Sequence, residues 1–463
     1  MSKENRTRRR QKKGSQALER LPVVNPDAAG IDLGSREHYV SVPPDRDPCS
    51  VRTFGCYTCD LQRMIEWLKS CRIKTVAMES TGVYWVPVFE ALEEAGIEAC
   101  LVDGREYRSA RKTDVWDSRK LRRLHMHGLL ARAFRPKDDI VRLRSLWRHR
   151  SNIVESCSRQ IHLMQKSLEQ MNVQLHKVVS DIAGQTGMAI LRSIVTGERD
   201  PRTLAKLRDR RCKLGPEEFV SALNGNFRME HLFTLSQALA AFDFFQGQLQ
   251  ECDLQIQAYM GTLPSKNGSV ATTPAGPPRR YRRKNQPHFD LRAELIRITG
   301  VDLTRIEGID SLTAQTIVSE CGTDVDRFPT EGHFSSWLRL CPNNRITGGI
   351  IRSRHTRSGV HRIAKSLRIA AQSLHRSQSP LGHFYRRMAA RNSKPQAIVA
   401  TANKTARVVY RMLKYGEAYV DQGQLQHQKR HQELQIQRLA RNSLRLGFFL
   451  VNTESGEIVD AVS

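Results

Sequence analysis

The sequence lacks any apolar run near the roughly 18–20 residues that a membrane-spanning helix needs. Its first residues contain no apolar signal core, so we expect a cytoplasmic protein with no membrane partner. Cysteines are few and scattered, 10 in 463 residues. The pair Cys56-x-x-Cys59 has no clear second pair, so we expect reduced thiols rather than a structural zinc site or disulfides.

Acidic residues are the scarcer charge. The chain has 47 Asp and Glu against 74 Lys and Arg, which gives a formal net charge of +27. Such an excess indicates a polyanionic partner, most plausibly nucleic acid, and says little about the fold. The length favours two or three domains.

Four of the scarce carboxylates stand in an informative order. Asp32 lies within an apolar strand pattern and Glu79 ends another, while Asp114 and Asp117 are three residues apart at the start of a helical pattern. Positions i and i+3 share one face of a helix, and an acid in a central strand is costly unless it is paired or metal-bound. Singly, each acid would be a cap or turn residue. Together they predict a site for one pair of hard divalent cations that could hold a phosphodiester.

The order of patterns divides the chain into six parts. Strand patterns at 28–33, 37–43, 50–55, 74–79 and 97–102, interrupted by helix patterns, resemble the ribonuclease-H-like layout. We expect a basic disordered tail (1–27), an α/β domain (28–137), a helical coiled-coil arm (138–262), a basic Pro/Gly linker (263–289), a mainly α C-terminal domain (290–420) and a peripheral tail (421–463).

The arm is predicted from an apolar spacing of three and four that runs from Leu143 to Ile182 and is interrupted only by Arg150. This heptad pattern indicates one long helix over 138–182 that pairs with another helix. The partner is either the same helix of a second chain, in at least a dimer, or a return helix over Leu232–Met260.

Three basic segments are candidates for nucleic-acid binding. One precedes the Asp114 helix and combines cations with Tyr107, which suits a phosphate backbone and a stacked base as well as it suits a loop of dispersed charge. The second lies in the Pro/Gly linker, and the third follows a Gly-Gly pair. The residues are Arg105, Arg108, Arg111 and Lys112; Arg279, Arg280, Arg282 and Arg283; and Arg352, Arg354 and Arg357.

Two features mark the C-terminal half. A turn around Gly308, with Asp310 or Ser311 as the cap of the next helix, is typical of a helix-hairpin-helix element that binds DNA backbone without reading sequence. Thr347 precedes Gly348-Gly349, where a backbone or phosphate can approach closely, and cations including His361 and Arg362 follow. The alternative, a basic turn between helices, would explain the two glycines but not the cluster of cations behind a hydroxyl.

These motifs carry a resemblance. Gly30-Ile31-Asp32, Met78-Glu79-Ser80-Thr81-Gly82 and Lys112-Thr113-Asp114-x-x-Asp117 resemble the acidic tetrad of DEDD-type insertion-sequence transposases, the Piv/MooV invertase-related family. The stretch from Ile306-Glu307-Gly308-Ile309 through Thr347-Gly348-Gly349 to Tyr410 is similar to the C-terminal transposase domain of that family. The likeness spans nearly all of residues 28–420.

The resemblance implies a RuvC-like N-terminal domain in which Asp32, Glu79, Asp114 and Asp117 bind Mg²⁺. It also implies a recombinase that forms a covalent link to DNA through a hydroxyl and is guided by a bridge RNA to donor and target DNA. The active site would join two domains across subunits, in a homo-oligomer from dimer to tetramer in the bacterial cytoplasm near the nucleoid. No Walker-type loop is present, in keeping with exchange that needs no ATP.

One residue departs from the family pattern. The family nucleophile is a serine before glycine, whereas this chain has Thr347, with Ser353 as the nearest other hydroxyl. Threonine is β-branched and more hindered. Two alternatives therefore stay open: a metal-dependent junction resolvase or nuclease that uses water, and a nucleic-acid-binding protein with weak catalysis.

Overall fold

The computed structural model describes residues 21–458 apart from 81, 105–112, 267–284, 354, 358, 360, 418–431, 434, 452–455 and 457. The chain divides into two compact units, Met1–Arg135 and Pro136–Ser463, which we describe separately. Within the described ranges, no helix combines the length and the apolar character that crossing a membrane would require.

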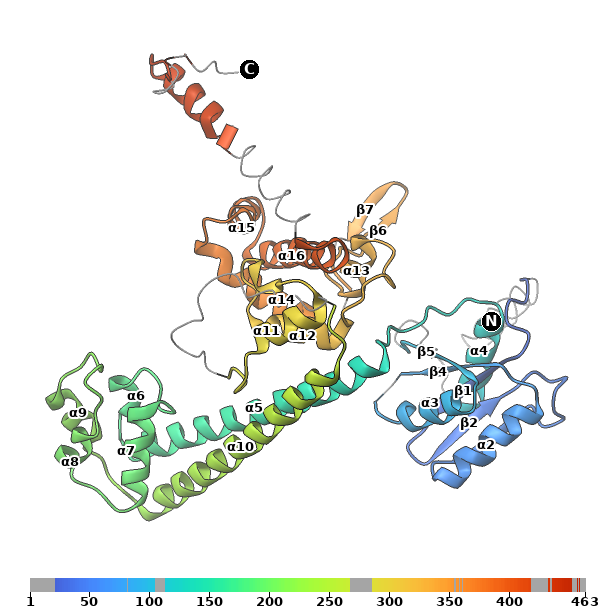
Figure 1. Ribbon diagram of the computed structural model, residues 1–463, viewed down its shortest axis with the longest axis horizontal. Coiled ribbons are helices and arrows are strands. Elements are labelled where there is room, and N and C mark those ends of the chain that lie inside the picture. The colour runs from blue at the N-terminus through green and yellow to red at the C-terminus, as the bar shows by residue number, and fades with distance from the viewer. Residues whose placement is uncertain are drawn as a thin grey trace, which may run out of the picture. The chain divides into compact units, whose positions relative to one another are not determined.

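The first unit is a mixed α/β domain built on a five-stranded sheet of order β3-β2-β1-β4-β5 (Figure 1). Strands β1, β2 and β3 pair antiparallel, whereas β4 and β5 continue parallel to β1. All five predicted strands are present, each within two residues of its predicted ends. The elements are β1 (Ala28–Leu33), β2 (Glu37–Ser41), β3 (Val51–Gly55), α2 (Thr58–Ser70), β4 (Thr75–Glu79), α3 (Trp85–Glu94), β5 (Glu98–Val102) and α4 (Asp114–Met126).

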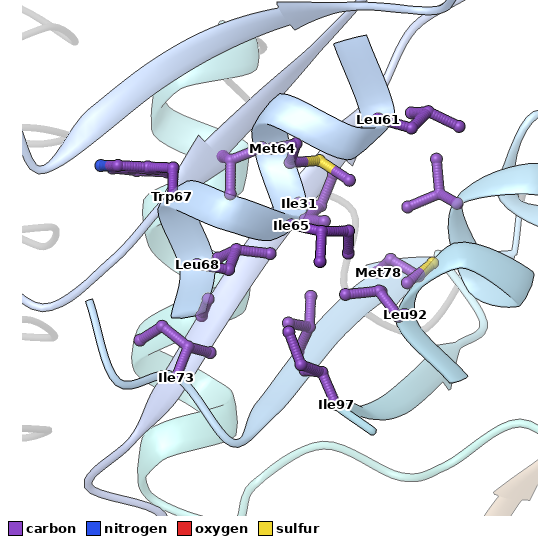
Figure 2. Close-up of a cluster of buried hydrophobic side chains, with 14 of the residues drawn as sticks. Ile31, Leu61, Met64, Ile65, Trp67, Leu68, Ile73, Met78, Leu92 and Ile97 are labelled. Atoms are coloured by element: carbon purple, nitrogen blue, oxygen red, sulfur yellow. The ribbon is translucent and has the colours of Figure 1, made fainter. Parts of the chain in front are cut away.

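Helices cover both faces of this sheet. Ile31 and Met78 point from β1 and β4 toward Met64 of α2 and Leu92 of α3, in the core drawn in Figure 2. A smaller cluster on the other face joins Ala77, Cys100 and Val102 of the strands to Leu121 of α4. The alternation of side chains along each strand thus sends successive residues into two different cores.

Two local details concern the ends of helices in this unit. Asp60 lies in the first turn of α2, and its carboxylate accepts a hydrogen bond from the backbone N–H of Tyr57 at 3.2 Å. The predicted basic tail lies outside the described residues up to Arg20, but Val24 and Asn25 both donate backbone hydrogen bonds to Met126 O. The chain just before β1 is therefore fastened to the end of α4.

The second unit begins with two long helices, α5 (Asp138–Gln170) and α10 (Met229–Thr262), that run side by side (Figure 1). The prediction of one helix over 138–182 is wrong in its length, because the helix ends at Gln170 and Asn172 has a left-handed φ of 55°. Four short helices join the long pair: α6 (Leu175–Val178), α7 (Gln185–Val195), α8 (Pro201–Lys206) and α9 (Pro216–Leu223).

The rest of the second unit is mainly helical. Its elements are α11 (Leu291–Thr299), η1 (Leu303–Arg305), α12 (Ser311–Cys321), α13 (Glu331–Trp337), β6 (Arg345–Thr347), β7 (Ile350–Ser353), α14 (Arg362–Ser373), η2 (Leu374–Arg376), α15 (Pro380–Arg391) and α16 (Lys394–Tyr415). The β6–β7 hairpin was not predicted. Its signal was present, since Gly-Gly flanked by β-branched residues is a hairpin pattern.

Candidate active site

The sheet register places Asp32 and Glu79 on one face. In the parallel pairing of β1 with β4, Gly30 lies opposite Ala77 and Ile31 opposite Met78, so the next residues along are Asp32 and Glu79. Paired residues of parallel strands share a face, and successive residues alternate. Because Ile31 and Met78 point toward α2 and α3, both acids belong to the face that α4 covers.

Helix α4 runs opposite to β1 and β4, which brings its first turn to the acidic ends of these strands. Near its end, His125 Nε2 lies 2.8 Å from Thr75 Oγ1 at the start of β4. In the middle, α4 crosses β1 at Gly30, where a Cβ would lie 2.4 Å from both Ser118 O and Arg122 N. Only glycine allows this approach. The first turn, with Asp114 and Asp117, therefore extends toward the carboxyl ends of β1 and β4.

Asp32 and Asp114 meet in one pocket of about 220 Å³, which the turn from β1 to β2 completes. Asp32 is half-buried and Asp114 is exposed. The lining residues are Asp32, Leu33, Gly34, Ser35, Arg36, Glu37, Tyr39 and Asp114.

Tyr39 reports the negative potential of this pocket. Its hydroxyl donates a 2.6 Å hydrogen bond to Glu37 Oε1. That hydrogen bond, then burial and the charges of Glu37 and Asp114, raise the pKa of Tyr39 above its ordinary value. No motif in the sequence indicated that this tyrosine borders the site.

Glu79 and Asp117 share the same end of the domain without lining that pocket. The carboxylate of Glu79 lies over Gly104, just after β5, where a Cβ would stand 1.7 Å from Glu79 Oε1. Asp117 is half-buried in the first turn of α4, and its charge acts on Lys120, whose pKa burial lowers despite the attraction of Asp117. Among the described residues, no three or more Asp, Glu, His or Cys side chains are grouped closely enough to hold a metal ion.

The pocket nevertheless suits a hard divalent cation. Mg²⁺ prefers oxygen ligands, keeps several waters and commonly uses only one or two protein carboxylates. Asp32 and Asp114 supply two carboxylates beside open solvent, and Glu79 is adjacent by strand register. The donor set present therefore fits Mg²⁺.

Thr347 is the last residue of β6, next to the tip of an exposed hairpin. Gly348 and Gly349 have φ values of 57° and 76°, and Thr347 pairs with Ile350 across this two-residue turn. A Cβ on either glycine would meet no described atom within 4 Å, so the tip projects clear of its surroundings. Ser353 lies farther down the hairpin, half-buried, opposite Arg345. Thr347 is thus the more accessible hydroxyl.

The predicted nucleic-acid contacts are described only in part. Arg352 and Arg357 are exposed near the hairpin. The other residues lie outside the described ranges: Arg105, Arg108, Arg111 and Lys112 before α4, Arg279, Arg280, Arg282 and Arg283 of the linker, and Arg354.

His361 is not the cation that its basic surroundings suggested. Burial, chiefly, with the charges of Arg339, Arg144 and Arg148, lowers its pKa to about 4 against the opposing pull of Glu320. Its ring packs edge-on against Trp337, with 4.4 Å between ring centroids. His361 is therefore neutral at pH 7.

Buried Glu320 of α12 forms a network of ion pairs with arginines of two neighbouring helices. Arg148 donates two hydrogen bonds to it, at 2.8 and 2.7 Å, while Arg144 and Arg362 lie within 3.3 and 3.8 Å. Burial alone would raise the pKa of Glu320, but these arginines outweigh it and hold the pKa below its ordinary value. Arg362 thus faces a carboxylate as well as solvent, and the network joins α5, α12 and α14.

Comparisons with known proteins match both units. A family model for transposases of the IS110 DEDD type matches residues 29–173, and a model described as transposase IS116/IS110/IS902 family matches residues 302–386. The first match contains all four acids, and the second contains Thr347. A search of curated proteins gave no significant match.

Proposed function

The chain belongs to the IS110 family of DEDD transposases, and from this premise we propose that it cuts and rejoins DNA through a covalent link to Thr347. The observation that supports the proposal most is the pocket shared by Asp32 and Asp114, with Glu79 adjacent by register. This pocket is acidic and open to solvent, as the cutting and rejoining of DNA by an enzyme of this family requires.

The acids would hold Mg²⁺ and the DNA phosphate. Asp32, Asp114, Glu79 and Asp117 are the proposed ligands, and bound Mg²⁺ would polarise the phosphate and favour the deprotonated hydroxyl. The N-terminus of α4 partly offsets the charges of Asp114 and Asp117. The closed packing of α4 on Gly30 fixes these two side chains relative to Asp32.

Thr347 would be the nucleophile. Its Oγ1 forms a bond to phosphorus as the bond from phosphorus to a sugar oxygen breaks, and the hydroxyl proton passes to solvent while the departing oxygen takes one up. A strand hydroxyl from the other DNA then attacks the protein–DNA ester and releases Thr347. Each step exchanges one phosphodiester for another, so no ATP is consumed. The exposed hairpin tip supports the proposal because it gives a DNA backbone access to this hydroxyl.

The partners proposed are donor DNA, target DNA and a structured bridge RNA, bound by a homo-oligomer in the bacterial cytoplasm. The net charge of +27 and the exposed Arg352 and Arg357 support binding to polyanions. We include the turn around Gly308 as a helix-hairpin-helix contact to DNA backbone, since Asp310 caps α12 by accepting from Thr313 N at 2.9 Å. We likewise assign the α5–α10 pair to a coiled-coil arm.

A junction resolvase that uses water is the second candidate. The β-branched Thr347 favours it, because a hindered secondary alcohol is a poorer nucleophile than the serine that the family uses. Such an enzyme would need the acids and would form no covalent intermediate. A nucleic-acid-binding protein with weak catalysis would need neither the acids nor a nucleophilic hydroxyl.

Strand exchange with purified protein, RNA, Mg²⁺ and both DNA sites tests the proposal. Thr347→Ala should abolish recombination and the protein–DNA adduct on denaturing gels, while RNA binding persists. Thr347→Ser should retain both, and Ser353→Ala serves as the matched control with activity intact. Full recombination by Thr347→Ala would show that the nucleophile is another group. Cleavage without an adduct in the unmodified protein would favour the resolvase.

A further inference from the structure

The acidic pocket contains one cation to which the proposed reaction gives no role. Of the eight described residues that line it, Asp32, Glu37 and Asp114 carry negative charge, whereas Arg36 carries positive charge. A DNA phosphate that enters this pocket meets three carboxylates, which repel it unless cations intervene. Bound Mg²⁺ would supply part of that compensation, and the cation that the chain itself supplies is Arg36.

The guanidinium of Arg36 is exposed and available for a ligand. Within the part of the chain that the structure describes, no carboxylate lies within 4.0 Å of its nitrogens, and no hydrogen bond reaches them. The adjacent carboxylate, Glu37, is instead held by the hydroxyl of Tyr39 at 2.6 Å. Three other arginines of this unit pair with acids: Arg46 with Asp27, Arg52 with Asp47, and Arg132 with Glu98.

The backbone beneath Arg36 is fixed by a tight turn. The turn Gly34–Glu37 joins β1 to β2, and Arg36 is its third residue. Gly34 N–H donates to Glu37 O at 3.1 Å, and a Cβ on Gly34 would lie 2.5 Å from that same oxygen. Only glycine allows this close approach. The turn therefore carries Arg36 at a constant position on the rim of the pocket.

An arginine at this place suits a phosphate better than it suits a metal ion. Its planar guanidinium presents paired N–H donors that match two oxygens of one phosphate, and it stays charged at every working pH. It cannot bind Mg²⁺, because it has no lone pair to offer. The pocket volume of about 220 Å³ is that of several water molecules, which leaves room for a phosphate beside a hydrated ion.

We propose that Arg36 binds the non-bridging oxygens of the DNA phosphate that is cut, and is thereby a catalytic residue in addition to the four acids. The proposal rests on the proposed function in that this pocket handles a DNA phosphate, and it holds whether Thr347 or water attacks. As the attacking oxygen bonds to phosphorus and the sugar oxygen leaves, the guanidinium donates hydrogen bonds to the non-bridging oxygens. It remains protonated throughout and stabilises their negative charge.

A purely structural role for Arg36 leads to a different expectation. If the guanidinium served only to offset the charges of Asp32 and Asp114, its removal would affect every DNA alike. A direct contact to the phosphate instead makes the effect of removing Arg36 depend on the charge of that one phosphate. The coupling between a protein charge and a substrate charge is therefore the quantity to measure.

Single-turnover cleavage of two DNAs at saturating protein and Mg²⁺ measures this coupling. One DNA has the normal scissile phosphate, and the other has a methylphosphonate there, in which an uncharged methyl group replaces one non-bridging oxygen. Arg36→Ala should slow cleavage of normal DNA about 10- to 100-fold, as expected for the loss of a hydrogen bond to a charged group. On the methylphosphonate diastereomer that lacks the oxygen facing Arg36, the same variant should slow cleavage less than about threefold.

Two further variants control for charge and position. Arg36→Lys keeps the charge but loses the paired donors, so its rate on normal DNA should lie between those of the unmodified protein and Arg36→Ala. Arg63→Ala removes an exposed cation from α2, which packs on the sheet face opposite to α4, and should leave both rates unchanged. Equal slowing by Arg36→Ala on normal DNA and on both diastereomers would overturn the proposal, as would an unchanged rate on normal DNA.

Binding in EDTA, followed by fluorescence anisotropy, gives a readout without chemistry. Arg36→Ala should bind normal DNA roughly threefold more weakly, the size of an exposed charge pair, and should bind the methylphosphonate DNA with unchanged affinity. Equal weakening for both DNAs would overturn the proposal. Asp32→Asn separates this failure from that of the proposed function. Full cleavage by Asp32→Asn would show that the pocket is not the site, whereas its inactivity beside a fully active Arg36→Ala would remove Arg36 alone.

Discussion

Arg150 of α5 and Asp253 of α10 form a buried ion pair between the two long helices, nearer the start of α5 and the end of α10. Arg150 Nε lies 2.5 Å from Asp253 Oδ1, and the two side chains are 4% and 2% exposed. The guanidinium also donates to Asn285 O at 3.0 Å, and Asp253 Oδ2 accepts from His288 N at 3.3 Å. The interruption in the apolar spacing of α5 is therefore the point where α5, α10 and the end of the linker are joined.

Removing one member of this pair should destabilise the second unit strongly. Arg150→Met leaves Asp253 buried without its cation, which typically costs about 3–5 kcal/mol. The double variant Arg150→Met/Asp253→Leu should recover most of the loss. Urea unfolding measures both. The control is Arg192→Ala, which breaks the exposed Arg192–Asp243 pair and should cost less than about 1 kcal/mol. Equal losses in the free energy of unfolding for Arg150→Met and Arg192→Ala would contradict the role of burial.

Gly30→Ala should separate the two halves of the acidic site. The added methyl would press on the backbone of Ser118 and Arg122, which cannot move without displacing α4. We expect a stability loss of about 1–3 kcal/mol and at least a tenfold loss of DNA cleavage, since Asp114 moves from Asp32. Gly261→Ala is the control, because a Cβ there meets no described atom within 4 Å. Cleavage at the unmodified rate would show that this packing does not position the acids.

Gly104→Ala should change the Mg²⁺ requirement more than the stability. The new Cβ would occupy the place of the Glu79 carboxylate, which is the far end of a flexible side chain and can swing away. Stability should change by less than about 0.5 kcal/mol, as for substitutions outside a packed core. If Glu79 is a ligand, the Mg²⁺ concentration at half-maximal cleavage should rise several-fold, approaching that of Glu79→Gln. An unchanged Mg²⁺ midpoint would remove Glu79 from the ligand set.

His361 should make the second unit sensitive to mild acid. Its folded pKa of about 4 lies below the ordinary value of 6.5, so the unfolded chain takes up a proton first as pH falls. The contribution of neutral His361 to the free energy of unfolding is fully present above pH 6.5 and is lost progressively as the pH falls toward 4. Between pH 7 and pH 5 the loss should be about 2 kcal/mol.

Urea unfolding of His361→Asn at both pH values tests this assignment. The variant should lose most of that pH dependence. For each protein, the free energy of unfolding at pH 5 is compared with the value of the same protein at pH 7. Exposed His355, replaced by Asn, provides the matched control and should keep the full pH dependence. The window above pH 5 avoids the titration of Glu320, whose pKa is depressed below 4.5. Identical pH profiles for unmodified protein and His361→Asn would contradict the assignment.

The sequence by itself determined the strands and helices of the first unit and the order of the four acids. These are local properties: apolar residues alternate in strands and recur every three or four residues in helices, and Asp32 and Glu79 fall where two such strands end. The same local rule predicted the return helix α10 within three residues at each end. It failed at Gln170, because apolar residues continue past the left-handed turn at Asn172, where they belong to the separate short helix α6 and not to α5.

Only the tertiary structure decided how these pieces meet. The alignment of Asp32 with Glu79 depends on the β1–β4 register, and the meeting of Asp32 with Asp114 depends on the close approach of α4 over Gly30; neither follows from the periodicity of one segment. The partner of Arg150 lies 103 residues away in sequence, and Glu320 gathers arginines from two other helices. Such contacts are set by the packing of whole elements, since a residue's neighbours in space belong to segments that its own sequence does not specify.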